Sequence, residues 1–210
     1  MSCPLKPRWE RRKDARPQEL LAAALDLFVE RGFAATRLDD VAKAAGVSKG
    51  TLYLYFCSKE ELFKAVVREN LVHVLDEAAD LIEQFTGTTE DLFRTLMLRW
   101  WQHMGESKLS GLPKLMIAEA GNFPELASFY QDEVISPTET LFQRMLMRGM
   151  QRNEVRELDL EMDVRLLIAP MIMMMIWQQP CSVCKVDRGE IRKYLDHYIN
   201  NAMQGLLVRN

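Results

Sequence analysis

Residues 38–56, with the sequence LDDVAKAAGVSKGTLYLYF, contain two short helical patterns separated by a turn. Gly46 lies at that turn, where two crossed helices often need a positive φ that a Cβ atom penalises. Ala42, Ala45 and Val47 are small enough to let the two helices approach closely. The stretch therefore predicts a helix-turn-helix, and an ordinary helical hairpin with a solvated polar end is the alternative.

The second helix of this pair begins with small and polar residues that suit a nucleic-acid groove. Such residues donate hydrogen bonds to phosphates or base edges when the helix lies in the major groove, and tyrosines add an apolar ring and a hydroxyl. The candidates for DNA contact in this helix are Ser48, Lys49, Gly50, Thr51, Tyr53 and Tyr55.

The rest of the chain is also helical, because apolar residues recur with a period of about 3.6 and Gly and Pro separate the periodic stretches. Thr36 is expected to cap the short helix that ends at Gly46, and Ser48 is expected to cap the helix over about 49–54. Ser58 with Glu61 predicts a capping box for the helix over about 59–84. The further expected helices span about 17–31, 49–54, 59–84, 89–105, 111–121, 124–152, 160–178 and 188–206. Pro137 and Pro170 fall inside two of them and are expected to kink or break them. The sequence predicts an all-α protein whose fourth helix, roughly 39 Å long, joins two domains.

Composition excludes several classes of protein. The 210 residues are 48% hydrophobic, which is ample for a buried core, and the longest nearly unbroken apolar stretch, 166–177, is shorter than the roughly 20 residues of a membrane span. No secretory signal is present, so a cytoplasmic location is expected. The net charge of the whole chain is -3, but residues 1–50 alone carry a net charge of +3. An acidic protein can bind nucleic acid when its positive charge lies at one end.

No metal or catalytic centre is predicted. Four cysteines are too few for a disulfide scaffold, and Cys181-x-x-Cys184 without a nearby histidine is a weak zinc signal. His73, His103 and His197 are scattered, and no Ser-His-Asp set, phosphate-binding loop or paired carboxylates can be identified. We expect no cofactor and no enzymatic activity.

Residues 22–63 closely resemble the DNA-binding domain of TetR-family regulators. The family pattern is matched at Phe28, at Gly32-Phe33, at Thr36 and at 41–42, 45–48, 50–53, 55–56 and 58–60. The resemblance implies that the six residues named above face the groove or its walls, that Lys59 reaches a phosphate, and that Thr36 contacts a flanking phosphate through its hydroxyl or backbone N–H. It divides the chain into a basic, flexible leader (1–16), a helix-turn-helix domain (17–57) and a ligand-binding and dimerisation domain (58–210).

Residues 115–150 resemble the ligand-sensing domain of one group of these regulators more loosely. In the family, the last two helices pack across a two-fold axis, and here the stretch after Arg165 is apolar all round, which indicates burial on every side. The resemblance implies a homodimer, and the expected interface residues are Met171, Met175, Ile191, Leu195, Tyr198, Ile199 and Ala202.

A small apolar effector is expected in the C-terminal domain. The expected ligand-binding residues are Met97, Trp100, Trp101, Met104, Met116, Glu119, Phe129, Tyr130 and Met174. Packing in the core is the alternative for the aromatic and methionine side chains. Glu119 shares a helical face with Leu112, Leu115 and Met116, so its carboxylate must either have a structural partner or meet a ligand.

The combined interpretation is a homodimeric repressor that an apolar effector releases from a near-palindromic operator, with recognition helices roughly 34 to 36 Å apart. The expected partners are operator DNA, a second copy of the chain and the effector, and no membrane. A regulator that activates transcription, one without an effector, and a protein that coats DNA without sequence preference remain alternatives.

Overall fold

The computed structural model describes residues 16–179 and 187–208 and confirms the all-α prediction. Within these ranges the only strand-like pairing is one isolated bridge between Val155 and Leu207. The α-helices are α1 (Arg16–Arg31), α2 (Leu38–Ala44), α3 (Lys49–Tyr53), α4 (Lys59–Gln84), α5 (Thr89–Trp100), α6 (Leu112–Glu119), α7 (Pro124–Tyr130), α8 (Ser136–Gln151), α9 (Leu160–Trp177) and α10 (Arg188–Leu206). The expected leader and the Cys181/Cys184 pair lie outside the described residues, except for position 16.

Helices α1 to α3 pack around the start of α4. Phe28, Phe33 and Phe63 are almost fully buried, and their ring centroids lie 5.5–5.6 Å apart. Gly46 has φ +68° between α2 and α3, a left-handed conformation that a residue with a Cβ adopts only at a cost. This turn fixes the crossing of the two helices, as the sequence predicts.

Side-chain caps set the starts of α3 and α4 as predicted. Ser48 accepts a hydrogen bond from the backbone N–H of Thr51, and Ser58 accepts one from that of Glu61. The prediction that Thr36 caps α2 is wrong. Arg37 occupies the cap position without a side-chain bond, because the Thr36 hydroxyl points into the protein.

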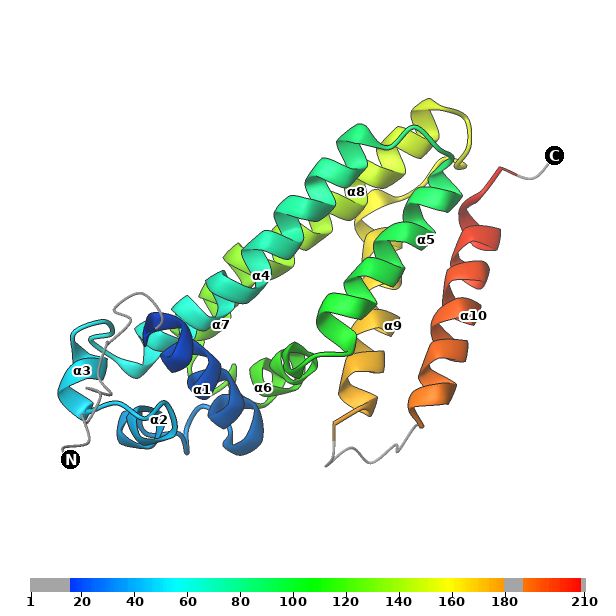
Figure 1. The fold of residues 1–210 in the computed structure, drawn as a ribbon. Helices are drawn as coiled ribbons and strands as arrows, with labels where there is room; N and C mark the ends of the chain where they lie inside the picture. Colours follow the sequence, from blue (N-terminus) through cyan, green and yellow to red (C-terminus); the bar gives the residue numbers. More distant parts are fainter. Residues whose placement is uncertain (1–15, 180–186, 209–210) are drawn as a thin grey trace, which may run out of the picture.

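Helix α4 carries the chain from the N-terminal unit into the C-terminal bundle, where α8 runs alongside it (Figure 1). Helices α5, α9 and α10 lie together on the other side of the bundle, and the short helices α6 and α7 lie between the bundle and the N-terminal unit. None of the described helices combines the length and apolar content that crossing a membrane requires.

Two expected long helices are interrupted by π-helical turns. The expected helix 89–105 consists of α5 followed by the π turn η1 (Trp101–Gly105), after which the 3₁₀ helix η2 (Lys108–Gly111) leads into α6. The expected helix 124–152 consists of α7, the π turn η3 (Gln131–Ile135) and α8. Pro137 follows η3, so the irregular turn lies where its ring would otherwise meet the carbonyl four residues earlier. By contrast, α9 continues through Pro170 without a break.

The described buried residues form two apolar cores. The first joins α1–α4 to α6 and α7, and the second joins the far end of α4 to α5, α8, α9 and α10. The first core therefore crosses the expected domain boundary between residues 57 and 58. Helices α6 and α7 therefore pack directly against α1 and α4 of the N-terminal unit.

Candidate DNA-binding face and ligand cavity

Helix α3 presents the expected recognition surface to solvent. Ser48, Lys49 and Gly50 are exposed, and the side chains of Tyr53 and Tyr55 remain 45% and 41% exposed although they are large and aromatic. Leu52 is fully buried and holds the helix against the first core. Leu54, which was not expected to contribute, is 83% exposed. The helix thus displays donors and apolar surface together, as groove recognition requires.

Lys49 at the start of α3 pairs with Asp39 of α2. Its ammonium lies 2.8 Å from one carboxylate oxygen of Asp39 and donates a hydrogen bond to the other at 3.0 Å. This hydrogen bond and the charge of Asp39 raise the pKa of Lys49. Both side chains are more than half exposed, so the pair can open when a phosphate approaches.

Two residues expected to contact phosphates make hydrogen bonds to the backbone of their own chain. Thr36 is 2% exposed, and its hydroxyl donates to the carbonyls of Leu27 and Gly32 while its backbone N–H donates to Phe33. The ammonium of Lys59 donates to the carbonyl oxygens of Phe33 at 2.7 Å and Ala34 at 3.2 Å. Thr36 is therefore buried away from a phosphate, whereas Lys59 is half-buried beside the hollow next to α3, and its phosphate contact stays a prediction.

Arg37 is a DNA-binding candidate that sequence reasoning missed. It is exposed at the start of α2 and borders the same shallow hollow as Tyr53 and Lys59. The sequence alone did not single out Arg37, because the burial of its neighbour Thr36 is seen only in the structure. A guanidinium there lies beside the recognition helix, where it can reach a phosphate.

A cavity of about 470 Å³ lies where the two cores meet. Helices α4 to α9 all contribute to its wall, which is predominantly aliphatic, aromatic and methionine side chains. Charged side chains on the wall are limited, among the described residues, to Glu77, Arg99 and the titratable His103, and all three are exposed. The interior therefore suits an apolar molecule of ordinary ligand size.

The cavity gathers some of the expected ligand-binding residues and excludes others. Those on its wall are Met97, Trp100, Met104, Met116 and Tyr130. Trp101, Phe129 and Met174 pack in the cores instead, and Glu119 faces the N-terminal unit. Met171 and Met175, which were expected at the dimer interface, line the cavity. The sequence reasoning also missed the walls supplied by α4 and α8.

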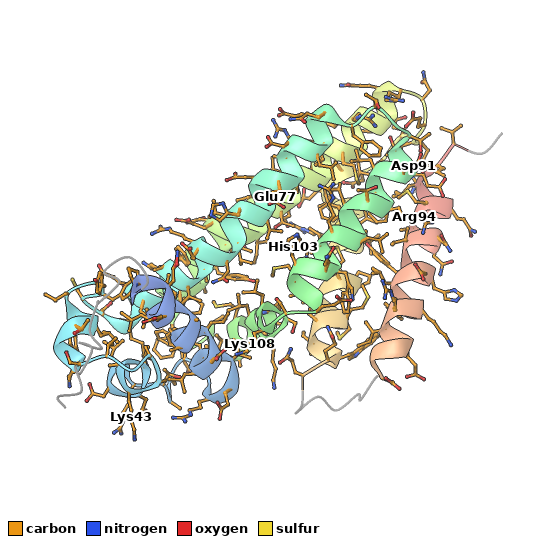
Figure 2. All side chains as sticks on the ribbon, in the orientation of Figure 1. Lys43, Glu77, Asp91, Arg94, His103 and Lys108 are labelled. Atoms are coloured by element: carbon orange, nitrogen blue, oxygen red, sulfur yellow. The ribbon has the colours of Figure 1, made fainter. Side chains whose placement is uncertain are left out.

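Glu77 on α4 and His103 in the π turn η1 face each other at the rim of the cavity (Figure 2). The imidazole Nε2 lies 4.0 Å from a carboxylate oxygen of Glu77. Arg99 is also exposed at this rim. A polar group on a bound molecule would therefore meet both signs of charge where the cavity opens to water.

Glu119 joins α6 to the turn after α1. It is 9% exposed, and its carboxylate accepts a hydrogen bond from the backbone N–H of Ala34 at 3.0 Å. Burial lowers the pKa of Lys59 close by, and Glu60 and Glu119 partly oppose this shift. Of the two alternatives that the sequence leaves open for Glu119, the structure supports the structural partner. Its neighbours Met116 and Ala120 line the cavity, so one short helix touches both sites.

The expected dimer residues are largely used inside one subunit. Met171, Met175, Ile191, Leu195 and Ile199 are at most 3% exposed, because α10 packs its apolar face onto α5 and α9 of its own chain. Tyr198 donates its hydroxyl to the Leu167 carbonyl, and Ala202 packs beside the second core. The five buried side chains therefore cannot meet a partner subunit, whereas Tyr198 and Ala202 are half-buried in the groove between α9 and α10 and stay predicted interface residues.

A different apolar stripe of α9 is exposed to solvent. Met162, Leu166 and Met173 are 51%, 70% and 43% exposed and recur on one side of the helix with the exposed Ala169. Tyr194 of α10 is 37% exposed beside Leu166 in the groove between the two helices. Four large apolar side chains thus face solvent on the last two helices.

Two family models together match most of the chain. Residues 20–66 match the model described as "Bacterial regulatory proteins, tetR family", and residues 83–197 match "Tetracyclin repressor-like, C-terminal domain". The curated HTH-type transcriptional repressor KstR2 of Mycolicibacterium smegmatis is 34% identical over 119 residues, which are 51% of this chain and 58% of that protein. The next two curated relatives are matched over 34% and 35% of their lengths.

Solved structures share the fold over nearly the whole chain. The fatty acid degradation regulator FadR from Bacillus halodurans is 22% identical, with a TM-score of 0.74 over 92% of this chain and 97% of that one. FadR from Bacillus subtilis in complex with stearoyl-CoA is 18% identical, with a TM-score of 0.70 over 90% of this chain and 98% of that one.

Proposed function

Because the chain belongs to the TetR family of bacterial transcriptional regulators, we propose that it is a homodimeric repressor that an apolar effector releases from a near-palindromic operator. The observation that carries this proposal is the double contact of α6. Met116 of this helix lies on the wall of the cavity, and Glu119 bonds to Ala34 beside the helix-turn-helix. A molecule in the cavity and the turn that leads from α1 into the helix-turn-helix therefore contact the same helix.

The proposed DNA contacts come from α3 and its surroundings. Ser48, Gly50 and Thr51 supply donors at the start of the helix, Lys49 supplies a charge, and Tyr53 and Tyr55 supply rings and hydroxyls. We add Arg37 as a phosphate contact because of its exposure beside Tyr53. Thr36 supports the fold of this face from within, and Lys59 binds the turn after α1 at the edge of the hollow, where it can also reach a phosphate.

We place the dimer interface on the exposed stripe of α9 formed by Met162, Leu166, Ala169 and Met173, together with Tyr194 of α10. A contiguous apolar surface of this kind marks an interaction site in a soluble protein. Two subunits related by a two-fold axis would bring two α3 helices to half-sites about one DNA turn, roughly 34 to 36 Å, apart. The operator should then be a near-palindrome.

The operator is released because the effector binds one form of the dimer more tightly than the other. An effector that fits the cavity better when α6 has shifted favours the form in which the two α3 helices no longer match successive major grooves. Glu119 and the packing of α6 against the first core would carry that shift to α1. The apolar wall and the stearoyl-CoA complex of the Bacillus subtilis relative both favour an effector with a largely hydrocarbon body.

Selection of bound fragments from random DNA duplexes tests the proposal. We expect enrichment of a near-palindromic sequence and a shift in mobility that corresponds to one dimer per site. Binding with no sequence preference and only a dependence on salt would instead indicate a protein that coats DNA. A reporter gene placed behind the selected sequence distinguishes repression from activation, since deletion of the regulator raises expression only in the first case.

A further inference from the structure

The wall of the cavity includes one buried residue, Tyr130, whose polar group has no hydrogen-bond partner among the described residues. Tyr130 ends α7, is 8% exposed, and lies on the cavity wall. No hydrogen bond reaches its hydroxyl from any described residue. Every fully enclosed side-chain nitrogen or oxygen in the described chain does have a partner. The hydroxyl oxygen must therefore touch open space, and the cavity is the hollow that Tyr130 lines.

The other polar side chains on the wall either have a hydrogen-bond partner or are more exposed than Tyr130. Thr138 donates its hydroxyl to the Val134 carbonyl, and the exposed Gln131 donates to Ser136. The indole N–H of Trp100 makes no hydrogen bond within the described chain, but Trp100 is only half-buried. Among the described residues of the wall, Tyr130 is thus the buried one whose polar group has no partner.

Burial raises the pKa of Tyr130 to about 12, so the phenol is neutral at physiological pH. A neutral hydroxyl donates one hydrogen bond and accepts others, and leaving it unpaired in an apolar wall is unfavourable. The charged Glu77 and Arg99 are exposed at the rim, so no cation of the described wall is buried to pair with a carboxylate. A neutral oxygen accepts the hydrogen bond of the phenol without requiring a buried cation.

The position of Tyr130 relates this contact to the regulatory movement. Tyr130 belongs to the first core with Met116 and α1–α4, so it marks the end of the cavity nearest the helix-turn-helix. The π turn η3 begins directly after it, and Glu133 in that turn pairs with Arg68 of α4. Isolated π turns are frequent at functional sites because they reposition the neighbouring side chains.

We propose that the effector is a largely hydrocarbon molecule with a neutral carbonyl or hydroxyl oxygen, and that Tyr130 selects it through a hydrogen bond to that oxygen. This inference rests on the proposed role of the cavity as the effector site. It assigns Tyr130 to specificity and the aliphatic wall to affinity. A hydrocarbon without the oxygen fills the same space but leaves the hydroxyl unpaired.

The test compares Tyr130→Phe with Tyr198→Phe, a matched control whose hydroxyl is bonded to the Leu167 carbonyl. Without any ligand, Tyr130→Phe should melt at or above the wild-type temperature, and Tyr198→Phe should melt below it. Tryptophan fluorescence is then titrated with matched pairs: dodecan-2-one and dodecane, octanophenone and octylbenzene, and 2-decalone and decalin. For each pair the ratio of the two dissociation constants is compared between proteins.

We expect Tyr130→Phe to weaken binding of the ketone relative to its hydrocarbon by about tenfold, and Tyr198→Phe to leave the ratio unchanged. Equal ratios in wild type and Tyr130→Phe, a clear loss of melting temperature in ligand-free Tyr130→Phe, or the failure of all six probes to bind would overturn the proposal. These titrations contain no DNA. A ligand that binds with the expected selectivity but does not release the operator counts only against the proposed function.

Discussion

The junction between α1 and α6 and the neighbouring cavity differ in whether their polar side chains have hydrogen-bond partners. At the junction, Glu119 accepts the Ala34 N–H, Lys59 donates to two carbonyls, and Thr36 donates to two more. In the cavity, the hydroxyl of Tyr130 has no partner among the described residues. A buried polar group with a partner holds the fold, whereas one without a partner is available to a ligand.

The largest expected effect comes from a charge placed where no partner exists. Ile199→Asp puts a carboxylate among the side chains of the second core, where Ile199 is 0% exposed, and should lower the free energy of unfolding by about 3–5 kcal/mol or prevent folding. Urea denaturation followed by circular dichroism measures this loss.

Leu166→Asp is the matched control on the exposed stripe of α9, where the side chain is 70% exposed. It should leave the helical content of the subunit intact and convert dimers to monomers in sedimentation velocity. If Leu166→Asp stays dimeric, the interface lies elsewhere. If Ile199→Asp is folded and monomeric, the helix face assigned here to the subunit core is wrong.

The junction offers the next largest effect. Glu119→Ala leaves the Ala34 N–H without its acceptor, and we expect a loss of about 1.5–3 kcal/mol in the free energy of unfolding. Glu119→Gln keeps an amide oxygen for that N–H and should lose less. Thermal and urea denaturation of both variants measure the difference. Stability equal to wild type in Glu119→Ala, together with weaker binding of ketones, would move this carboxylate from the junction to the cavity.

Local signals in the sequence predicted most of the helices because their causes are local. The bounds of α4 follow from the cap at Ser58 and from its apolar period, and the turn before α3 follows from Gly46. The π turns were missed because a shift of one residue in the apolar period does not stand out in a long amphipathic stretch. The partner of Glu119 could not be predicted, since Ala34 lies 85 residues away in the chain.

Five of the side chains expected at a dimer interface are buried inside the subunit, and the sequence could not show this for a physical reason. Helix α9 is apolar on nearly every side, so its sequence does not show which side meets α10 of the same subunit and which side is free. The cavity was only partly predicted for the same reason. Met171 and Trp101 are equally apolar, and only the packing of six helices decides that the first lines the cavity and the second does not. The assignments of individual side chains to DNA and to an effector stay predictions.

A smaller effect on stability is expected for a side chain that is exposed and has no buried hydrogen-bond partner. Tyr53→Ala removes an exposed ring from α3 and should leave the free energy of unfolding within about 0.5 kcal/mol of wild type. It should weaken operator binding by about tenfold, because both the ring and the hydroxyl are lost at the groove. Gel shifts on the selected operator measure this change.

Lys59→Ala provides the contrast to Tyr53→Ala. Its ammonium holds the carbonyls of Phe33 and Ala34, so stability should fall together with DNA binding. If Lys59→Ala keeps full stability and loses affinity equally for all DNA sequences, its ammonium binds a phosphate as the family resemblance implies.

The smallest expected effect concerns the exposed pair of Lys49 and Asp39. In the wild type, Asp39 binds the ammonium of Lys49 and raises its pKa. Asp39→Asn removes this charged partner. Because both side chains are more than half exposed, solvent replaces the lost contact, and the melting temperature should not change measurably. Operator affinity should instead rise a few-fold, since Lys49 is free to meet a phosphate and one negative charge near the DNA is gone. Combining Asp39→Asn with Lys49→Met separates these two causes. If the gain in affinity survives without Lys49, it came only from the lower negative charge, and Lys49 does not contact the operator. A gain that disappears in the double variant assigns the phosphate contact to Lys49.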